Sequence, residues 1–214
     1  MINVVHNSDC LPAMREMKDN QFDLCIVDPP YGIGMGNYQR TKFDRAGMRH
    51  KKGEWDANTP TDEYFDELQR VSKNQIIWGG NYFPHLWYNG CKGFIFWYKH
   101  QPVDNYAKGE LAWTSFDTPA KCFDYMYYGN INNDVGERIH QTQKPIKLYK
   151  WLLKHYAKEG NTILDTHVGS GSSRIACWEM GFDFTGFEID KDYWEAQEKR
   201  FNIVKNQMNM FQNE

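Results

Sequence analysis

The sequence predicts an α/β fold built around a mainly parallel sheet. Short apolar runs typical of buried strands alternate with amphipathic helical segments almost throughout the 214 residues. The runs end at glycine, proline or an acidic residue, and no linker or change of composition divides the chain. We therefore expect a single domain over residues 1–214, long enough to bury a core without metal or disulfide support.

The predicted elements follow one another in this order. A strand over 2–5 and a short helix over 11–18 lead to a buried strand over 22–27, which a proline pair terminates. After a long polar stretch, Thr59–Glu63 offers a capping hydroxyl, a proline and two acids, which is typical of a helix start. Further strands are expected over 75–78, 94–98, 122–128 (antiparallel), 162–164 and 184–187, and helices over 145–158, 173–180 and about 192–204.

Composition narrows the protein class. No apolar stretch approaches membrane-spanning length, and the first residues enter a strand pattern without a signal segment. Five cysteines without any C-x-x-C spacing indicate free thiols in a reducing compartment, so we expect a cytoplasmic protein without a membrane anchor. The formal net charge of −3 means that nucleic-acid binding requires a local basic patch.

The sequence Asp28-Pro29-Pro30-Tyr31 forms a candidate catalytic corner. Proline biases its predecessor toward extended geometry, so Asp28 is expected to project from the carboxyl end of the 22–27 strand. A carboxylate, a backbone carbonyl and an aromatic face then project from one corner, which suits a flat ligand with an exocyclic amino group. A solvated aspartate at a Pro-Pro loop exit is the plainer alternative.

The polar stretch 32–59 contains a basic segment. Between residues 40 and 52 it carries six Lys and Arg residues against one acid, Asp44, and these are interleaved with aromatic side chains, so it is a candidate DNA-contacting arm. A solvated loop is the alternative reading. The candidate DNA-binding residues are Arg40, Lys42, Arg45, Arg49, Lys51 and Lys52.

A second candidate site is the glycine-rich turn that starts at Asp165, with Glu188 at the end of the next strand. Glycines let a ligand approach the backbone, and an acid at the following strand end can hold ribose hydroxyls. The turn matches neither G-x-G-x-x-G nor a P-loop. Asp165 would repel a pyrophosphate but can bind an ammonium group, so S-adenosylmethionine is the cofactor that fits, against the alternative of an unliganded turn.

Together the two motifs resemble the DNA amino-methyltransferases. D-P-P-Y at 28–31 is similar to their catalytic motif, with Asp first as in N6-adenine enzymes, and residues 165–172 are similar to D-P-F-x-G-S-G-T. His140–Pro145 is similar to H-P-T-Q-K-P, and Asn7–Cys10 to the stretch ahead of D-P-P-Y. The cofactor-binding residues that the resemblance implies are Asp9, Cys10, Thr142, Lys144, Asp165, Thr166, His167, Gly169, Ser170, Gly171, Ser172 and Glu188.

The resemblance implies a Rossmann-like S-adenosylmethionine-dependent methyltransferase fold. The expected sheet has seven strands, one antiparallel, in the circularly permuted motif order of the β class. The catalytic half would span about 1–130 and the cofactor-binding half about 140–205. The implied reaction is methylation of adenine N6 on a flipped base in DNA, without a metal. A homodimer and a restriction endonuclease partner are both compatible with this family.

Two departures from the family pattern stand out. Thr166 and His167 replace Pro-Phe, so the imidazole either contacts the cofactor or is a plain loop histidine. The gap 129–139 is too short for a separate target-recognition insertion, which leaves the target sequence open. An N4-cytosine methyltransferase is the nearest alternative function. A non-catalytic DNA-binding module comes next, and a nicotinamide-dependent oxidoreductase is more distant.

Overall fold

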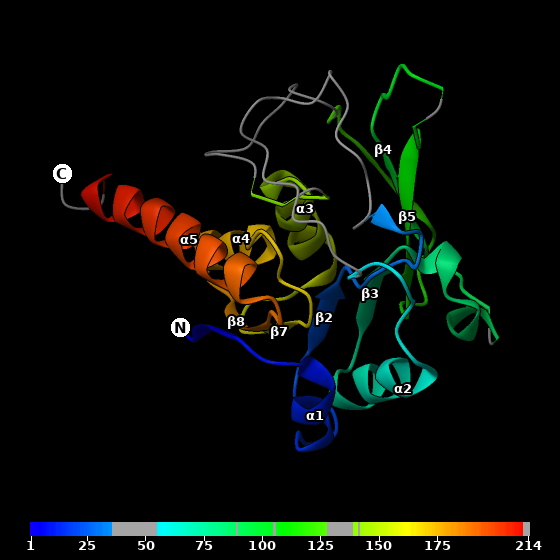
Figure 1. Ribbon diagram of the computed structural model, residues 1–214, viewed down its shortest axis with the longest axis horizontal. Coiled ribbons are helices and arrows are strands. Elements are labelled where there is room, and N and C mark those ends of the chain that lie inside the picture. Colours follow the sequence, from blue (N-terminus) through cyan, green and yellow to red (C-terminus); the bar gives the residue numbers. More distant parts are fainter. Residues whose placement is uncertain (36–54, 89, 105, 128–138, 141, 212–214) are drawn as a thin grey trace.

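An eight-stranded sheet forms the centre of the molecule, with strand order β1-β8-β7-β2-β3-β5-β4-β6 (Figure 1). The computed structural model describes residues 1–35, 55–88, 90–104, 106–127, 139–140 and 142–211. The strands are β1 (Asn3–His6), β2 (Leu24–Val27), β3 (Gln75–Trp78), β4 (Ile95–Tyr98), β5 (Gly109–Thr114), β6 (Lys121–Asp124), β7 (Thr162–Asp165) and β8 (Asp183–Phe187). The α-helices are α1 (Cys10–Arg15), α2 (Asp62–Val71), α3 (Ile146–Tyr156), α4 (Ser172–Met180) and α5 (Lys191–Phe211).

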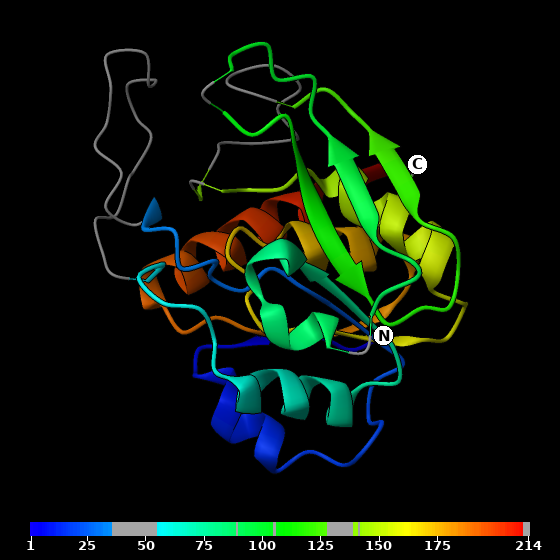
Figure 2. The ribbon, with the colours of Figure 1, turned by 90° about the vertical axis from the view of Figure 1, so that its right-hand side faces the viewer.

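Helices cover both faces of the sheet, because successive side chains of a strand point to opposite sides. In β2, Leu24 and Ile26 join the apolar cluster that contains residues of α3, α4 and α5. Cys25 and Val27 join the other cluster, which contains residues of α1 and α2. Figures 1 and 2 show the two helical layers on either side of the sheet. A central strand buried on both faces is typical of such three-layer α/β folds.

The expected strands and helices are present, with three corrections. The sheet has eight strands in the described part of the chain instead of seven. The antiparallel strand is β5, which the sequence did not predict; β6 pairs parallel with β4, so the expectation of an antiparallel strand over 122–128 was wrong. β5 escaped prediction because its sequence contains a glycine and a glutamate and lacks Val and Ile. Helix α5 continues to Phe211, beyond the expected end near 204.

The chain leaves the centre of the sheet in opposite directions from β2 and β7. From β2 it passes through α2 to β3 on one side, and from β7 it passes through α4 to β8 on the other. The boundary between β2 and β7 is therefore a topological switch point, where open α/β sheets bind ligands at the carboxyl ends of their strands. None of the helices in the described ranges has the length and apolarity needed to span a bilayer.

Candidate active site

Asp28 lies at the carboxyl end of β2, beside the end of β7. β2 is buried along its whole length and pairs in parallel with both β3 and β7. The strand ends at Val27, and the Asp28 side chain that follows is 17% exposed. β7 ends at Asp165. The two predicted motifs therefore begin at the same edge of the sheet, on either side of the switch point.

A buried carboxylate, Asp56, holds the chain that follows the corner. It accepts backbone N–H groups from Tyr31 at 2.7 Å, Gly32 at 2.9 Å and Met35 at 2.9 Å. Gly32 has a φ of 72°, which a glycine adopts without strain. Asp56 therefore fixes the chain where it leaves the corner formed by Asp28–Tyr31. The sequence reading missed it, since an acid within a polar loop carries no pattern of its own.

Tyr31 packs tightly into the corner. Its hydroxyl donates to Asp28 Oδ1 at 2.6 Å, and its ring stacks on Tyr82 with centroids 5.0 Å apart and an interplanar angle of 17°. Gly79, just after β3, permits this placement: a Cβ there would lie 2.2 Å from Cε1 of Tyr31. Tyr82 is 40% exposed, so the stack reaches the molecular surface.

Lys144 connects the corner to strand β5. Its Nζ lies 2.5 Å from Asp28 Oδ2 and 3.0 Å from Glu110 Oε2, and it donates to the Tyr31 hydroxyl at 3.2 Å. Glu110 forms a second ion pair, with Lys99 of the segment after β4. The Lys144 side chain is 2% exposed, whereas Glu110 and Lys99 are about one-fifth exposed. Two carboxylates and two ammonium groups thus form one electrically balanced cluster.

The cluster fixes the charge states of its members. Burial alone would raise the pKa of Glu110, but the ammonium groups of Lys144 and Lys99 lower it to about 2. Burial likewise disfavours a charged Lys144, yet Asp28 and Glu110 together hold its pKa above the usual value. Burial, reinforced by Asp28, raises the pKa of Tyr31 well above that of a free tyrosine. Near neutral pH, Lys144 and Glu110 are therefore charged and Tyr31 carries its proton.

Asp165 binds both ends of the glycine-rich turn through hydrogen bonds to its side chain. It is 2% exposed and accepts the His167 N–H at 2.9 Å and the Ser173 hydroxyl at 2.6 Å. Burial raises its pKa to about 7, with the two hydrogen bonds acting in the opposite direction. An ammonium ligand that reached this carboxylate would therefore stabilise its ionised form.

The rest of the turn closes over the start of α4. Gly169 and Gly171 have φ values of 53° and 77°, which residues with a side chain rarely adopt. Ser170 and Ser172 are buried, and Arg200 from α5 donates to the Ser170 carbonyl at 2.8 Å and to the Ser172 hydroxyl at 2.9 Å. Both predicted serines thus have structural partners within the turn.

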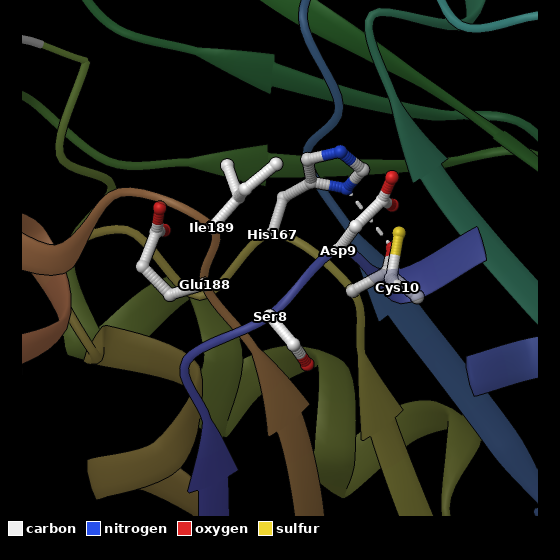
Figure 3. A pocket seen from close by; sticks show the side chains of 7 residues that line it. Ser8, Asp9, Cys10, His167, Glu188 and Ile189 are labelled. Atoms are coloured by element: carbon white, nitrogen blue, oxygen red, sulfur yellow. Dashed lines mark hydrogen bonds between the residues drawn. The ribbon is translucent and has the colours of Figure 1, made fainter. Parts of the chain in front are cut away.

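A cavity of about 120 Å³ opens beside the turn. Figure 3 shows Asp9, His167 and Glu188 around it, contributed by the start of α1, the turn and the end of β8. Glu188 accepts the Gly169 N–H at 2.9 Å, and Asp9 caps α1 by accepting the Leu11 N–H at 3.0 Å. The complete lining is Ser8, Asp9, Cys10, Thr166, His167, Glu188 and Ile189.

His167 is positioned by a hydrogen-bonded chain. Its Nδ1 lies 3.0 Å from the Thr166 hydroxyl, which lies 2.6 Å from the hydroxyl of Tyr64 on α2. Burial lowers the pKa of His167 to about 4, so the imidazole is neutral at physiological pH. Burial also raises the pKa of Cys10 to about 12, which keeps it a thiol. The sequence reading missed Tyr64, whose helical spacing marks it as an ordinary core residue.

His140 and Lys144, four residues apart, contact different motifs: His140 lies beside the glycine-rich turn and Lys144 binds Asp28. His140 packs on the ring of Tyr193 with centroids 4.5 Å apart and lies next to Gly169, while Lys144 reaches Asp28. Thr142 contacts His140 Nδ1 through its hydroxyl at 3.1 Å. The expected contact of Lys144 with the cofactor carboxylate stays a prediction, since its Nζ here lies among Asp28, Glu110 and Tyr31.

The predicted DNA-contacting side chains lie outside the described residues. This applies to all six: Arg40, Lys42, Arg45, Arg49, Lys51 and Lys52. Across the part of the chain that the structure does describe, no group of three or more His, Cys, Asp or Glu side chains is arranged to hold a metal ion.

Comparison with known families identifies the chain. The sequence profile of a family described as DNA methylase, covering N6 and N4 methyltransferases, matches residues 77–199, more than half of the chain. The chain belongs to this family. The matched region includes the glycine-rich turn, Lys144 and Glu110, whereas Asp28–Tyr31 precede it.

Individual relatives are similar to this chain in sequence, and solved structures are similar to it in fold. The chain is 25% identical to the type II methyltransferase M.HpaI of Haemophilus parainfluenzae, over 91% of this chain and 73% of that protein. It is 23% identical to M.HinfI of Haemophilus influenzae, over 95% and 69%. Among solved structures, the M1.HpyAVI–SAM complex superposes with a TM-score of 0.61 at 19% identity, covering 94% of this chain and all of that one. The cytosine-N4-specific PvuII DNA methyltransferase gives 0.62 at 10% identity, covering 97% and 92%. These structures share the fold.

Proposed function

We propose that the chain transfers a methyl group from S-adenosylmethionine to adenine N6 of a base flipped out of DNA. The observation that carries this proposal is the position of the Asp28 carboxylate. It stands at the switch point, next to the strand that enters the glycine-rich turn, in a member of the DNA methylase family. Asp in the first position of D-P-P-Y, as in the N6-adenine enzymes that the sequence resembles, favours adenine as the target.

The cavity beside the turn fits part of the cofactor. Its acidic residues, Asp9 and Glu188, are acceptors for hydroxyl and amino groups and would repel a phosphate. The neutral imidazole of His167 can lie against a nucleoside without bringing a charge. Asp165 and Lys144 are the groups we expect toward the amino-acid end, together with Thr142 and the turn itself. When bound, S-adenosylmethionine supplies an electrophilic methyl group on a sulfonium.

The corner residues orient the acceptor nitrogen. The lone pair of adenine N6 is delocalised into the ring, so its use as a nucleophile requires the amino group to be pulled toward tetrahedral geometry. Asp28 accepts one N6–H and the Pro29 carbonyl accepts the other. After transfer, N6 carries the methyl group and one surplus proton, which Asp28 is placed to accept. Most of the rate gain comes from positioning.

Tyr31 supports the flipped base by stacking. One of its faces contacts Tyr82 in this structure, so the base uses the other face or moves Tyr82 aside. Pro30 follows Pro29 and keeps this corner stiff, since proline fixes φ. Affinity for the DNA backbone would come from the basic segment within 32–59, and a homodimer would add further contacts.

The test is the Asp28→Ala variant assayed with tritiated S-adenosylmethionine on DNA of mixed sequence. We expect methyl transfer to be abolished, while calorimetry shows cofactor affinity within a few-fold of wild type. The matched control is Asp117→Ala, which removes an exposed carboxylate paired with Lys92. Full activity of Asp28→Ala would refute the proposed mechanism.

Nucleoside analysis of the product distinguishes adenine from cytosine. The proposal predicts N6-methyladenine. N4-methylcytosine would establish the second candidate, which the fold shared with the cytosine-N4-specific PvuII enzyme supports. Both reactions place an exocyclic amino group against Asp28, so the corner would work in the same way.

A further inference from the structure

The catalytic carboxylate already has two hydrogen-bond donors in this structure. The Tyr31 hydroxyl occupies Asp28 Oδ1 at 2.6 Å, and Lys144 Nζ occupies Oδ2 at 2.5 Å. The ammonium group of lysine and the exocyclic amino group of a base present the same kind of N–H donor to a carboxylate. Lys144 therefore sits where a target amino group would bind, and the two compete for Asp28.

Glu110 offers Lys144 a second anion without requiring it to leave the site. Its Oε2 lies 3.0 Å from the same Nζ, on the side of the cluster formed by β5. Lys99 binds the other oxygen of Glu110, Oε1, which anchors the carboxylate in place. The Lys144 side chain is 2% exposed, so water cannot replace a lost anionic partner at low cost.

The charges of the cluster also allow Lys144 to move from Asp28 to Glu110. Asp28 and Glu110 contribute two negative charges, and Lys99 and Lys144 contribute two positive charges. If Glu110 were neutral, the buried Lys144 would depend on Asp28 alone and would hold it more strongly. With Glu110 ionised, Lys144 can shift its hydrogen bonds to Glu110 and free an oxygen of Asp28.

We propose that Glu110 is a positioning residue for methyl transfer: it holds the Lys144 ammonium off Asp28 when the target amino group enters. This inference rests on the proposed function and deepens it, since it concerns the same carboxylate. Glu110 touches neither the target base nor the cofactor in this scheme and acts through Lys144. Lys99 keeps Glu110 in place.

The test compares Glu110→Gln with the double variant Glu110→Gln/Lys144→Met. The glutamine keeps the shape of Glu110 but removes its charge, so we expect kcat to fall about tenfold or more, because a hydrogen bond to a charged group is lost. The KM for S-adenosylmethionine should stay within about twofold, since the mechanism removes no cofactor contact. Removing Lys144 as well takes away the competitor, so the double variant should regain most of the lost kcat at saturating S-adenosylmethionine. The loss of the contact expected between Lys144 and the amino-acid end of the cofactor would show separately, as a raised KM for S-adenosylmethionine. Glu63→Gln, which breaks an exposed ion pair with Arg15, is the matched control and should behave as wild type.

The outcomes separate this inference from the proposed function. An inactive wild-type protein refutes the proposed function and the inference with it. An active wild type with an equally active Glu110→Gln overturns the inference alone. So does a double variant as impaired as Glu110→Gln, since Lys144 would then be needed for a purpose other than competing for Asp28. Should Glu110→Gln fail to fold by circular dichroism, the double variant is compared with wild type instead, because it loses one negative and one positive charge and so keeps the cluster neutral. A kcat near the wild-type value then supports the inference, and a kcat about tenfold lower overturns it.

Discussion

Replacing Asp165 by asparagine tests the electrostatics of the glycine-rich turn. Asparagine keeps an oxygen that accepts the His167 N–H but cannot ionise. In the folded protein, burial raises the pKa of Asp165 from 3.8 to about 7. Because the folded pKa is the higher one, the native state binds the proton more tightly. Protonated Asp165 therefore stabilises the folded state. This contribution to the free energy of unfolding is fully present below about pH 4 and is lost as the pH rises from about 4 to 7.

The size of the effect follows from the pKa shift. Each pH unit between the two pKa values changes the free energy of unfolding by about 1.4 kcal/mol for one proton. From pH 5 to pH 7, where the folded group becomes half ionised, the wild type should lose about 2 kcal/mol relative to Asp165→Asn. All other titrating groups are common to both proteins and cancel in the difference.

Urea denaturation followed by tryptophan fluorescence at pH 5, 6 and 7 measures this difference. Asp117→Asn, an exposed carboxylate paired with Lys92, should track the wild type at all three pH values within about 0.5 kcal/mol. If the Asp165→Asn and wild-type curves stay parallel from pH 5 to pH 7, Asp165 does not have a raised pKa and the reasoning fails.

Three further predictions concern the supports of the two motifs. Asp56→Ala removes the acceptor of three backbone N–H groups and should cost about 3 kcal/mol of unfolding free energy, measured by urea denaturation, and lower kcat. Gly79→Ala places a Cβ 2.2 Å from Tyr31 Cε1 and forces a positive φ on alanine, so kcat should fall about tenfold or more in a methylation assay. His167→Phe removes a partly buried histidine whose folded pKa, about 4, lies below its unfolded value of 6.5. The wild type should therefore lose stability as pH falls from about 6.5 to 4, by roughly 3 kcal/mol, and the variant should lack this contribution in pH-dependent melts.

The first two of these predictions have matched controls. Asp104→Ala removes an exposed carboxylate paired with Lys108, and Gly90→Ala changes a glycine of positive φ with open space around it. Neither control should lower kcat. A stable Asp56→Ala, an unimpaired Gly79→Ala, or a His167→Phe protein with the wild-type acid response would each contradict the corresponding argument.

The fold was largely predictable because its signals are local. β3 over Gln75–Trp78 is a short apolar run. α4 ends at Met180 and is capped by Gly181, whose φ of 78° only a residue without a side chain adopts readily. β5 was not predictable in the same way. It is held by hydrogen bonds from β3 and β4 on both sides, so its position depends on partners that its own residues do not reveal.

In the candidate site too, residues within a sequence motif were predictable, and residues that act through distant neighbours were not. Asp28 and the glycine-rich turn are sequence motifs, and the structure brings them to the same edge of the sheet. Asp56 and Glu110 act through neighbours that are distant in sequence: Asp56 binds the Tyr31 N–H, and Glu110 binds Lys144. No periodicity or spacing marks such residues, because a lone acid in a loop or strand is usually solvated.

The cluster around Asp28 also bears on how the chain is divided. Asp28, Lys99 and Glu110 belong to the expected catalytic half of about 1–130, whereas Lys144 lies near the start of the expected cofactor-binding half of about 140–205. Without Lys144, Asp28 and Glu110 would face each other as like charges with Lys99 as their nearest counter-charge, which is unfavourable in a partly buried site. Residues 1–130 therefore depend on residues 140–205 for the charge balance of this cluster as well as for two strands of the sheet, β7 and β8. A fragment that ends before residue 139 should lack a competent corner even where its strands form.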